Sequence, residues 1–554
     1  MKKPVIAIGL DAAEPTLIEQ WMAEGYLPNL SRLRDRGTYT RVQNFKYYKA
    51  ETPWTSFTTG CSAHTTGYWS PLRLDVKNYD IDLVAAYDFK EYPPFYALGD
   101  DYRVAIFDMP QVALSENVNG IQILGWGGHS SQTPSHSLPA NLFNEIVSKY
   151  GLHRGYKKDH AECLNLDELL ELQKLLEEGI VQRTKISQDI LAQENWDLFL
   201  TMFGETHAAG HFMWHLSQPE HPLYQAFASR CQGDPMREVF QAVDRAIGEI
   251  ISKAPENANI VVFSAHGMKD NVMDLPSTLF LPELMYRYCF GKAALAEGKL
   301  GETLPPPITD AKQKYWLQDV WRLKEDSNLI RKFLRQNLPS RYVHWAEKLF
   351  ASHDELDLEN LYKLIEQNHP AFNQPATWYK SCWSKMKAFA LASFSEGYVR
   401  INLQGRDPNG MVPPSEYENV CNEVTELLYN LKDGRTGQPM VMEVMRTRKS
   451  AAENDPKLPD ADLVVIWQED YATDVVDSPE LGRIGPVPHH RTGSHRSTGF
   501  LFAQGSDIAP GTNLPEGHSL DLAPTILSLM GADIPKHFEG KSLIQKTALA
   551  GSVS

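Results

Sequence analysis

Three short apolar runs in this sequence are each followed by residues that can bind a metal ion, and this pattern constrains the fold more than any other feature. The runs precede Asp11, the pair His207 and His211, and His266. Far later in the chain, His495 lies in a Gly-Ser-His-Arg segment. In a sheet covered by helices, ligand sites lie at the carboxyl ends of the strands. We therefore expect these segments to meet around a catalytic metal centre.

The bulk composition excludes several kinds of partner. The chain has 554 residues, of which 42% are hydrophobic and 22% charged, proportions that are ordinary for a globular enzyme. A formal net charge of −16 argues against nucleic acid, and no dense Lys/Arg tract favours a membrane surface. No apolar run approaches the ~18 residues that span a bilayer. We expect no nucleic-acid partner and no membrane partner.

The cysteines and the N-terminus bear on the compartment. Six cysteines are scattered without a Cys-x-x-Cys pair, which fits unpaired thiols in a reducing compartment. The apolar stretch after Met1-Lys2-Lys3-Pro4 is only about six residues long, so it fits a first strand better than an export signal. We expect a cytoplasmic protein.

Apolar runs of strand length alternate with helical patterns through the first half of the chain. Runs that are apolar on both sides are typical of a sheet covered by helices on both faces. The pattern predicts an α/β fold with a mostly parallel central sheet flanked by helices. The expected strands are Val5–Leu10, Arg103–Phe107, Trp196–Met202 and Ile260–Ser264, and the helical patterns include Asp167–Glu178 and Glu238–Lys253.

The character of the sequence changes after about Asp274. The following hundred or so residues are rich in Trp, Tyr, Lys and Glu with helix-like spacing, and strand signals return at Asp462–Trp467 and Thr498–Ala503. We interpret the middle of the chain as an insertion, partly helical, that caps the site. The expected domains are the first part of the core at 1–280, the inserted cap at 281–460 and the second part of the core at 461–554.

Each isolated candidate ligand also has a simpler interpretation. Asp11 precedes a plausible helix start, where Asp is a favoured N-cap. His266 is a single histidine, a residue that is more often structural than a ligand, although Gly267 beside it lets backbone come close to a site. His495 lies in a Gly/Pro loop rich in His and Arg, which could bind an anion, bind a metal or simply face water.

His207 and His211 are four residues apart, so on a helix they share one face about a turn apart. Two imidazoles at this spacing suit zinc or a similar divalent ion. His215 continues the same stripe, and a polar helix face is therefore the competing interpretation.

Taken together, the motifs resemble the alkaline phosphatase superfamily, specifically its type I phosphodiesterase/nucleotide pyrophosphatase-like branch. The similarity runs from residue 4 to about 543 and includes the segments Trp54–Gly60, Ser264–Met268, Asn402–Arg406 and Asp521–Leu527. The resemblance implies an alkaline-phosphatase-like core with two divalent ions at the carboxyl edge of the sheet. The implied ligands are His207, His211 and His495 for one ion, with Asp11 and His266 for the other.

Three departures from the family pattern concern the chemistry. His207 stands where the family has Asp, which gives a three-histidine set with an open fourth position, as in catalytic zinc sites. Ala265 stands where the family has a second Asp and cannot bind a metal. The position of the family nucleophile falls on Ala50, and the nearest hydroxyl is Thr52. Glu51 is placed to be a substitute ligand or a general base.

We expect a metal-dependent hydrolase or transferase acting on a small, anionic phosphoester or phosphodiester substrate. Thr52 and Glu51 are its candidate catalytic residues, and zinc is the favoured cofactor, with one or two ions and with manganese or iron also suited to a histidine-rich site. One alternative is a mononuclear hydrolase that uses activated water on a sulfo-, phosphono-, ester or amide bond. Another is a non-catalytic member of the family.

Overall fold

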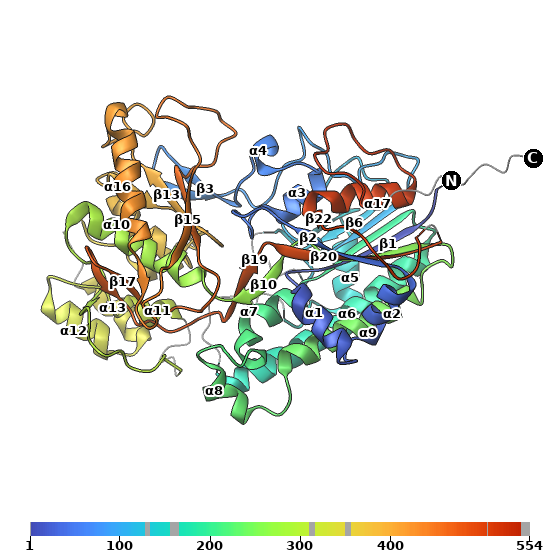
Figure 1. The fold of residues 1–554 in the computed structure, drawn as a ribbon, viewed down its shortest axis with the longest axis horizontal. Helices are drawn as coiled ribbons and strands as arrows, with labels where there is room; N and C mark the ends of the chain where they lie inside the picture. Colours follow the sequence, from blue (N-terminus) through green and yellow to red (C-terminus); the bar gives the residue numbers. More distant parts are fainter. Residues whose placement is uncertain are drawn as a thin grey trace, which may run out of the picture.

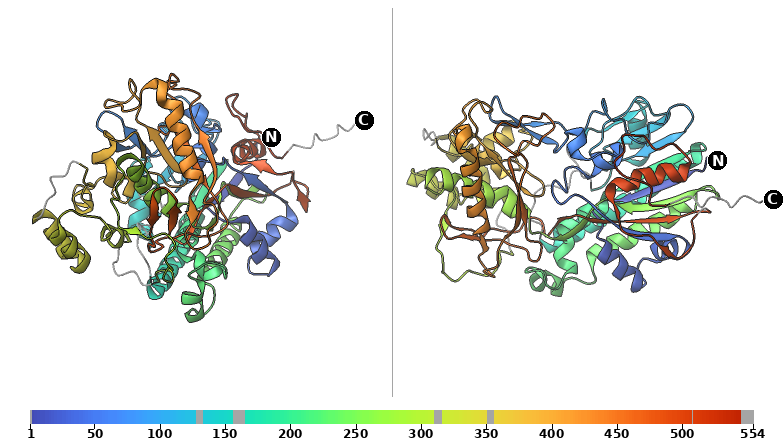
Figure 2. Two further views of the ribbon diagram at one scale, coloured as in Figure 1. Left: turned by 60° about the vertical axis from the view of Figure 1, so that its left-hand side comes forward. Right: turned by 45° about the horizontal axis from the view of Figure 1, so that its top comes forward.

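The structure is a computed structural model that describes residues 2–127, 133–155, 165–309, 316–349, 356–506 and 508–544. Figure 1 shows two lobes, one built on a large sheet and the other containing the middle of the chain. The two further views in Figure 2 show the same separation. Segments from both halves of the sequence build the first lobe.

The first lobe is organised around a ten-stranded sheet. In spatial order its strands are β21 (Thr512–Asn513), β2 (Thr38–Gln43), β20 (Thr498–Gln504), β9 (Asn259–Ser264), β1 (Val5–Leu10), β8 (Leu198–Phe203), β5 (Val104–Phe107), β6 (Gly120–Leu124) and β7 (His136–Leu138), and β22 (Gly517–His518) also pairs with β2. β1 runs parallel to β8 and β9, and β5 runs parallel to β8 and β6. β20 is antiparallel to both its neighbours, β2 and β9. The expected α/β fold with a mostly parallel sheet is confirmed.

Helices cover both faces of this sheet. Ile6, Ile8 and Leu10 of β1 pack into one body of buried side chains, and Val5 and Ala7 pack into another on the opposite face. Burial on both faces explains why the strands are continuous apolar runs. The first face is covered by α1 (Pro15–Ala23), α2 (Pro28–Arg36), α5 (Leu142–Tyr150), α6 (Leu166–Gln193), α7 (Glu205–Ser217), α8 (Tyr224–Phe227) and α9 (Pro235–Ile251), and the second by α3 (Pro53–Thr59) and α17 (Leu522–Met530).

The second lobe contains two four-stranded sheets. One is β12 (Ala388–Ala390), β13 (Gly397–Ile401), β16 (Leu463–Trp467) and β15 (Val441–Arg446), and the other is β11 (Glu297–Gly298), β18 (Gly482–Ile484), β17 (Val476–Ser478) and β14 (Lys432–Asp433). The hairpin of β3 (Leu72–Asp75) and β4 (Asp80–Leu83) shares its buried core. The helices are α4 (Ala63–Thr66), α10 (Leu281–Phe290), α11 (Trp316–Trp321), α12 (Leu329–Asn337), α13 (Ser340–Leu349), α14 (Leu361–Glu366), α15 (Lys380–Trp383) and α16 (Tyr417–Tyr429). Within the described ranges, no helix combines the length and apolar character needed to cross a bilayer.

The pairing of β16 places it in the second lobe. The sequence pattern predicts that the core resumes at 461, but β16 pairs antiparallel with β13 and β15. The chain rejoins the first lobe at β19 (Gly493–Arg496) and β20. Because a fully buried strand has the same apolar pattern in either sheet, the sequence alone does not show which sheet it joins.

The interior of the second lobe is aromatic. Aromatic side chains that are at most 2% exposed fill the core of the lobe. They include Trp316, Trp321, Trp378, Tyr379, Trp383, Tyr417 and Trp467.

The cysteines that the structure describes are free thiols, as the sequence predicts, and Cys163 lies outside the described residues. The described cysteines are Cys61, Cys231, Cys289, Cys382 and Cys421.

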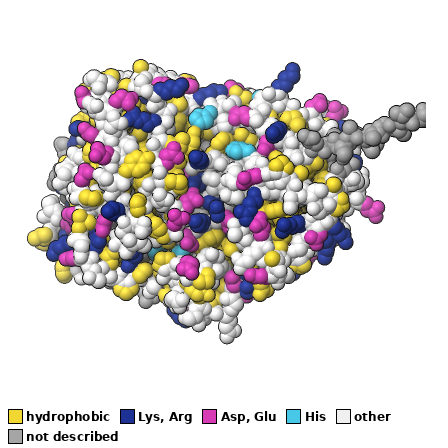
Figure 3. Space-filling view, viewed as in Figure 1, with side chains coloured by type: hydrophobic (Ala, Val, Ile, Leu, Met, Phe, Trp, Pro, Cys, Tyr) yellow, Lys and Arg dark blue, Asp and Glu magenta, His cyan; other side chains and the backbone are white. Residues whose placement is uncertain are grey.

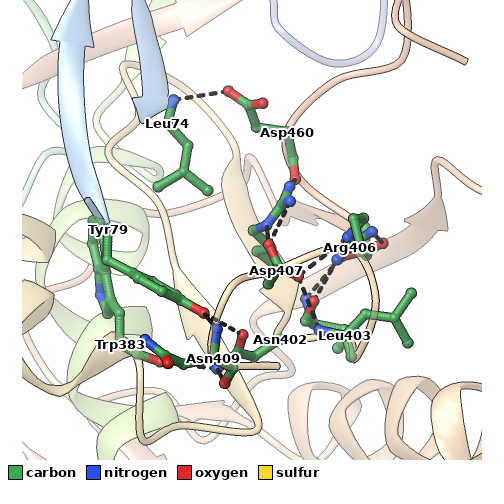
Figure 4. Close-up of polar contacts among 12 residues, drawn as sticks. Leu74, Tyr79, Trp383, Asn402, Leu403, Arg406, Asp407, Asn409 and Asp460 are labelled. Carbon is green, nitrogen blue, oxygen red and sulfur yellow. Dashed lines mark hydrogen bonds and ion pairs between the residues drawn. The ribbon is translucent and has the colours of Figure 1, made fainter. Parts of the chain in front are cut away.

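A buried network of ion pairs and hydrogen bonds surrounds Arg406 and Asp407 (Figure 4). Arg406 donates to both carboxylate oxygens of Asp462, each at 2.7 Å, and Arg400 donates to Asp407 at 2.7 Å. Arg448 also approaches Asp462, at 3.5 Å. The Arg406 side chain is 14% exposed and is already paired with Asp462. The segment Asn402–Arg406, which is part of the resemblance, therefore has a structural role.

Replacing Asp462 with Ala tests that role. The change leaves Arg406 and Arg448 without their buried partner, so we expect the free energy of unfolding to fall by about 3–5 kcal/mol. Urea denaturation measures the loss. As a control, Asp470, whose side chain is 80% exposed, is replaced with Ala. The control should change stability by less than about 0.5 kcal/mol, and an equally small effect at Asp462 would contradict a structural role.

Candidate metal centre

The expected ligand segments converge at one edge of the large sheet. Asp11 follows β1, His207 and His211 lie on α7 directly after β8, and His266 follows β9. The late segment arrives as β19, which pairs antiparallel with β10 (Gly267–Asp270) and places His495 opposite Met268. Because β1, β8 and β9 are parallel neighbours, their carboxyl ends bring these side chains together.

His207, His211 and His495 form a compact group. Each offers a ring nitrogen, and these three atoms lie within 4.8 Å of one another. The Nε2 atoms of His207 and His211 are 3.1 Å apart. Two imidazoles on one tetrahedral zinc ion, each bonded at about 2.0–2.1 Å, place their nitrogens about 3.3 Å apart. The three side chains are at most 7% exposed, and the donor set therefore fits a zinc-like divalent ion.

The orientation of His211 is fixed by a hydrogen bond from outside the group. Its Nδ1–H donates to the carbonyl of Gly493 at 2.7 Å, which leaves the Nε2 lone pair directed at His207. The backbone N–H of Thr492 in turn donates to the carbonyl of His211 at 2.7 Å. A Cβ at Gly493 would lie 2.2 Å from the carbonyl oxygen of Gly210, so only glycine allows β19 to approach α7 this closely.

His495 is held in the neutral form that binds metals. Burial lowers the pKa of its imidazole well below 6.5, and the neighbouring His211 and His266 lower it further. Its Nδ1 is buried and makes no hydrogen bond within the described part of the chain. Its ring centre is 5.1 Å from that of His207 and 4.9 Å from that of His211.

Asp11 and His266 form a second group next to the first. Nε2 of His266 is 3.6 Å from Oδ1 of Asp11, and the His266 ring centre is 4.9 Å from that of His495. The indole of Trp54 packs edge-on against His266 at 5.6 Å. Ala265, which precedes His266, is fully buried and adds no ligand. The second group thus offers one carboxylate and one imidazole.

Glu51 is directed toward the second lobe. Its Oε1 accepts hydrogen bonds from the backbone of Phe394 at 2.9 Å and the hydroxyl of Tyr398 at 3.0 Å. Its Oε2 accepts from the Ser395 hydroxyl at 2.6 Å. Among the described contacts, none joins Glu51 to the histidines. Burial, and then the charge of Glu396, raises the pKa of Glu51 to about 7.

Thr52 is the N-cap of α3, and its hydroxyl donates to the carbonyl of Tyr48 at 2.9 Å. The hydroxyl proton of Thr52, which a nucleophile must lose, is therefore donated to a backbone carbonyl. On the next turn, the buried hydroxyls of Thr55 and Ser56 make no hydrogen bond within the described residues. Both residues lie in the Trp54–Gly60 segment of the resemblance, and no local pattern predicts a role for either of them.

The start of α7 is anchored by a buried ion network that the sequence does not predict. Glu205, the first residue of α7, accepts from Arg183 at 3.0 Å and lies 2.9 Å from Nε2 of His153. Arg183 also pairs with Asp108 at 2.9 Å. Burial alone would raise the pKa of Glu205, but the charge of Arg183 and the contact with His153 lower it to about 2. The partners are far apart in sequence, so no local pattern identifies them.

Arg491 lies beside the centre. Its Nη1 is 3.4 Å from Nε2 of His211 and 4.0 Å from the carboxylate of Asp274. The sequence predicts a candidate anion site in this basic loop but does not distinguish Arg491 from its neighbours. A guanidinium at this position adds positive charge where an anionic substrate would meet the histidines.

This geometry agrees with the family of the sequence. The model of the type I phosphodiesterase/nucleotide pyrophosphatase family matches residues 5–288. The chain belongs to that family. Membership places it in a family named for phosphodiester and nucleotide pyrophosphate hydrolysis and confirms the family that the motifs resemble.

Solved structures of low sequence identity also align with the chain. A phosphonoacetate hydrolase from Sinorhizobium meliloti, in complex with phosphonoformate, is 14% identical with a TM-score of 0.47, and the alignment covers 96% of each chain. A mutant of the alkaline phosphatase PafA is 11% identical with a TM-score of 0.47 and 98% of each chain covered. No curated protein sequence matches the chain.

Replacing His211 with Ala removes one of the three imidazoles. We expect zinc affinity to fall by at least roughly 100-fold, since loss of a group that only orients a ligand already costs about 10–100-fold. Competition with a chromophoric chelator measures the change. The control is His64→Ala on α4, where the side chain is exposed. Unchanged zinc affinity in the His211 variant would remove this residue from the centre.

Replacing Glu51 with Gln tests its contact with the second lobe. The folded-state pKa of about 7 lies above the ordinary 4.5, so the fold favours the protonated acid. That stabilisation is fully present below pH 4.5 and is lost as the pH rises through 7. Relative to the variant, the wild type should lose roughly 1–3 kcal/mol between pH 5 and pH 8.5.

Chemical denaturation at the two pH values measures this difference. The matched control is Glu249→Gln on α9, where the side chain is exposed. This variant should follow the wild type at both pH values. Parallel pH profiles for the wild type and the Glu51 variant would show that Glu51 is ionised throughout.

Proposed function

We propose that the chain is a metal-dependent hydrolase of small, anionic phosphoester or phosphodiester substrates. The observation that carries the proposal is the convergence of His207, His211 and His495 into one buried group, with Asp11 and His266 beside it. Three imidazoles with an open fourth position are the donor set of a catalytic zinc ion. The approach of Arg491 to His211 supports an anionic substrate.

Within this proposal, the histidines have a binding role. His207, His211 and His495 would hold the ion, and the Gly493 carbonyl keeps the His211 lone pair directed toward it. A bound zinc ion would polarise a phosphoryl oxygen or lower the pKa of water to about 7. Arg491 would pair with a non-bridging oxygen of the substrate and offset its charge.

The nucleophile is either the Thr52 hydroxyl or water. As a nucleophile, Thr52 would rotate its hydroxyl away from the Tyr48 carbonyl, pass its proton to a base such as His266 and displace the substrate alcohol as the P–O bond breaks. Water would then hydrolyse the phosphothreonine. In the second route water attacks phosphorus directly, His266 accepts the proton of the water, and the alcohol leaves as the P–O bond breaks. Neither route uses Glu51, because both of its carboxylate oxygens already accept hydrogen bonds from the second lobe.

The side-chain route is tested by two substitutions of Thr52. If its hydroxyl attacks phosphorus, Thr52→Ala should lower the turnover of an aryl phosphate and an aryl phosphodiester by about 1,000-fold or more. Thr52→Ser, which keeps the hydroxyl, should retain most of the activity. Single-turnover assays with zinc-loaded protein provide the measurement. Full activity of the Ala variant would leave water as the nucleophile.

A second candidate function is favoured by Ala265. Without a carboxylate at this position, the group of Asp11 and His266 offers an ion two side-chain ligands, and a single ion on the three histidines would then work alone. Such a centre would use water on a sulfo-, phosphono-, ester or amide bond.

Metal content separates the one-ion and two-ion proposals. If Ala265 abolishes the second site, the zinc-loaded wild type should contain about one ion per chain and Ala265→Asp about two. Elemental analysis after gel filtration measures both. Two ions in the wild type would favour the two-ion phosphoester mechanism. A metal-loaded protein inert towards phosphate, sulfate, phosphonate, ester and amide substrates would instead favour a non-catalytic role.

A further inference from the structure

Ser395 lies between two buried carboxyl groups. Its Oγ is 2.6 Å from Oε2 of Glu51 and 2.6 Å from Oε2 of Glu396. All three residues are 0% exposed. A serine hydroxyl carries one proton, so it can donate to only one of the two carboxyl oxygens. The other contact is equally short and needs a proton from its carboxyl group.

The partners of Glu396 identify it as the charged member of the pair. Its Oε2 accepts from the backbone N–H of Tyr48 at 2.7 Å, and its Oε1 is 3.3 Å from Nζ of Lys49. Burial alone would lower the pKa of Lys49, but the charges of Glu396 and Glu469 raise it, so the ammonium group stays charged. A buried ammonium group needs ionised partners. Of the two carboxyl groups beside Ser395, Glu396 is therefore the carboxylate.

The contacts of Glu51 suit a neutral acid. Among the described contacts, none brings a cation to its carboxyl group. Its Oε1 accepts from the backbone N–H of Phe394 at 2.9 Å and from the hydroxyl of Tyr398 at 3.0 Å, as the carbonyl oxygen of an acid would. Its Oε2 is then the oxygen that carries the proton, and the lone pairs it keeps can still accept from the N–H of Ala50 at 3.2 Å.

The same contacts hold the chain segment that carries Thr52. We call residues 48–52 the Thr52 segment. Glu396 binds its first residue through the backbone N–H of Tyr48, and Glu51 binds the second lobe from within it. The Tyr48 carbonyl in turn accepts from the Thr52 hydroxyl at 2.9 Å and from the Thr52 backbone N–H at 3.1 Å. A change at the two glutamates therefore reaches Thr52 through Tyr48.

We infer that Glu51 and Glu396 share one proton through Ser395, and that this proton holds the Thr52 segment against the second lobe. Oε2–H of Glu51 donates to Oγ of Ser395, and the Ser395 hydroxyl donates to Oε2 of Glu396. Hydrogen bonds from a hydroxyl to an ionised carboxylate are short, which agrees with the distances of 2.6 Å. The three residues are positioning residues for Thr52, and this role rests on the proposed function.

The shared proton lies in a site closed to solvent. Figure 3 shows charged side chains of both signs near the middle of the view, where the two lobes meet, whereas Glu51 and Glu396 are fully buried. Loss of the proton would leave two buried carboxylates with one hydroxyl proton between them, which is unfavourable. Within the described residues, the titratable groups around the pair are Tyr48, Lys49, Tyr68, Tyr398 and Glu469.

The proton is lost near neutral pH. Burial, and then the charge of Glu396, raises the pKa of Glu51 to about 7. Because the acid is protonated below this pH, the contact is intact in mild acid and weakens as the pH rises through 7.

Infrared difference spectroscopy tests whether Glu51 holds the proton. At about pH 5.5 the wild type should show the carbonyl band of a neutral acid that is missing from Glu51→Gln and that disappears by about pH 8.5. Glu396→Gln removes the neighbouring charge, so the midpoint of this band should fall to about pH 6 or lower. The control Glu249→Gln, at an exposed position on α9, should keep the wild-type band.

Hydrogen–deuterium exchange tests whether the proton holds the Thr52 segment. At about pH 6, after correction for intrinsic rates, the amides of this segment should exchange roughly tenfold faster in Ser395→Ala than in the wild type. At about pH 8.5 the two proteins should exchange alike. The matched control is Ser393→Ala, because the Ser393 hydroxyl is also buried but makes no hydrogen bond within the described residues. The control should exchange like the wild type.

Turnover of an aryl phosphodiester tests the positioning role. With zinc-loaded protein at about pH 6, Ser395→Ala should lower kcat by about tenfold and leave KM nearly unchanged, whereas Ser393→Ala should keep wild-type activity. As the pH rises through 7, kcat of the wild type should fall toward that of Ser395→Ala.

Three results would overturn the inference. Identical infrared spectra for the wild type and Glu51→Gln would show that Glu51 holds no proton. Equal exchange in the wild type and Ser395→Ala would show that the proton does not hold the Thr52 segment. Equal kcat values for these two proteins would remove the positioning role. A wild type without hydrolase activity would refute the proposed function alone, because the spectra and the exchange rates do not depend on turnover.

Discussion

The candidate centre depends on the hydrogen bond from Nδ1 of His211 to the carbonyl of Gly493. It joins two segments 282 residues apart and selects the ring nitrogen that His211 turns toward His207. β19 supplies both this carbonyl and the third imidazole, His495, so one strand orients one ligand and provides another. The close approach of β19 to α7 is possible because residue 493 is glycine.

The charge of the candidate centre is set by few carboxylates. The resemblance implies carboxylates where this chain has His207 and Ala265, and Asp11 is the carboxylate in the group of Asp11 and His266. Arg491 beside His211 adds positive charge. Such a site favours strong attraction of anions over tight retention of a second cation. The number of bound ions therefore bears on the nucleophile, because a single ion would act through activated water and would not need Thr52.

Much of the fold could be predicted from local pattern, because β1, β8 and β9 are continuous apolar runs that end at candidate ligand residues. The same reasoning identified the five residues that the structure brings together. It did not identify the partners of Glu51, which are Phe394, Ser395 and Tyr398 of the other lobe. It also did not place β16 in the second lobe or identify the Arg183–Glu205 pair. These features depend on contacts between segments distant in sequence, which have no local signature.

The central claim is that three imidazoles share one ion, and X-ray absorption at the zinc edge tests it most directly. For the zinc-loaded wild type, the account predicts at least three imidazole nitrogens at about 2.0–2.1 Å from the metal. The His211→Ala variant should show one imidazole fewer or no ordered zinc. A zinc environment without histidine, or one that is identical in wild type and variant, would contradict the account.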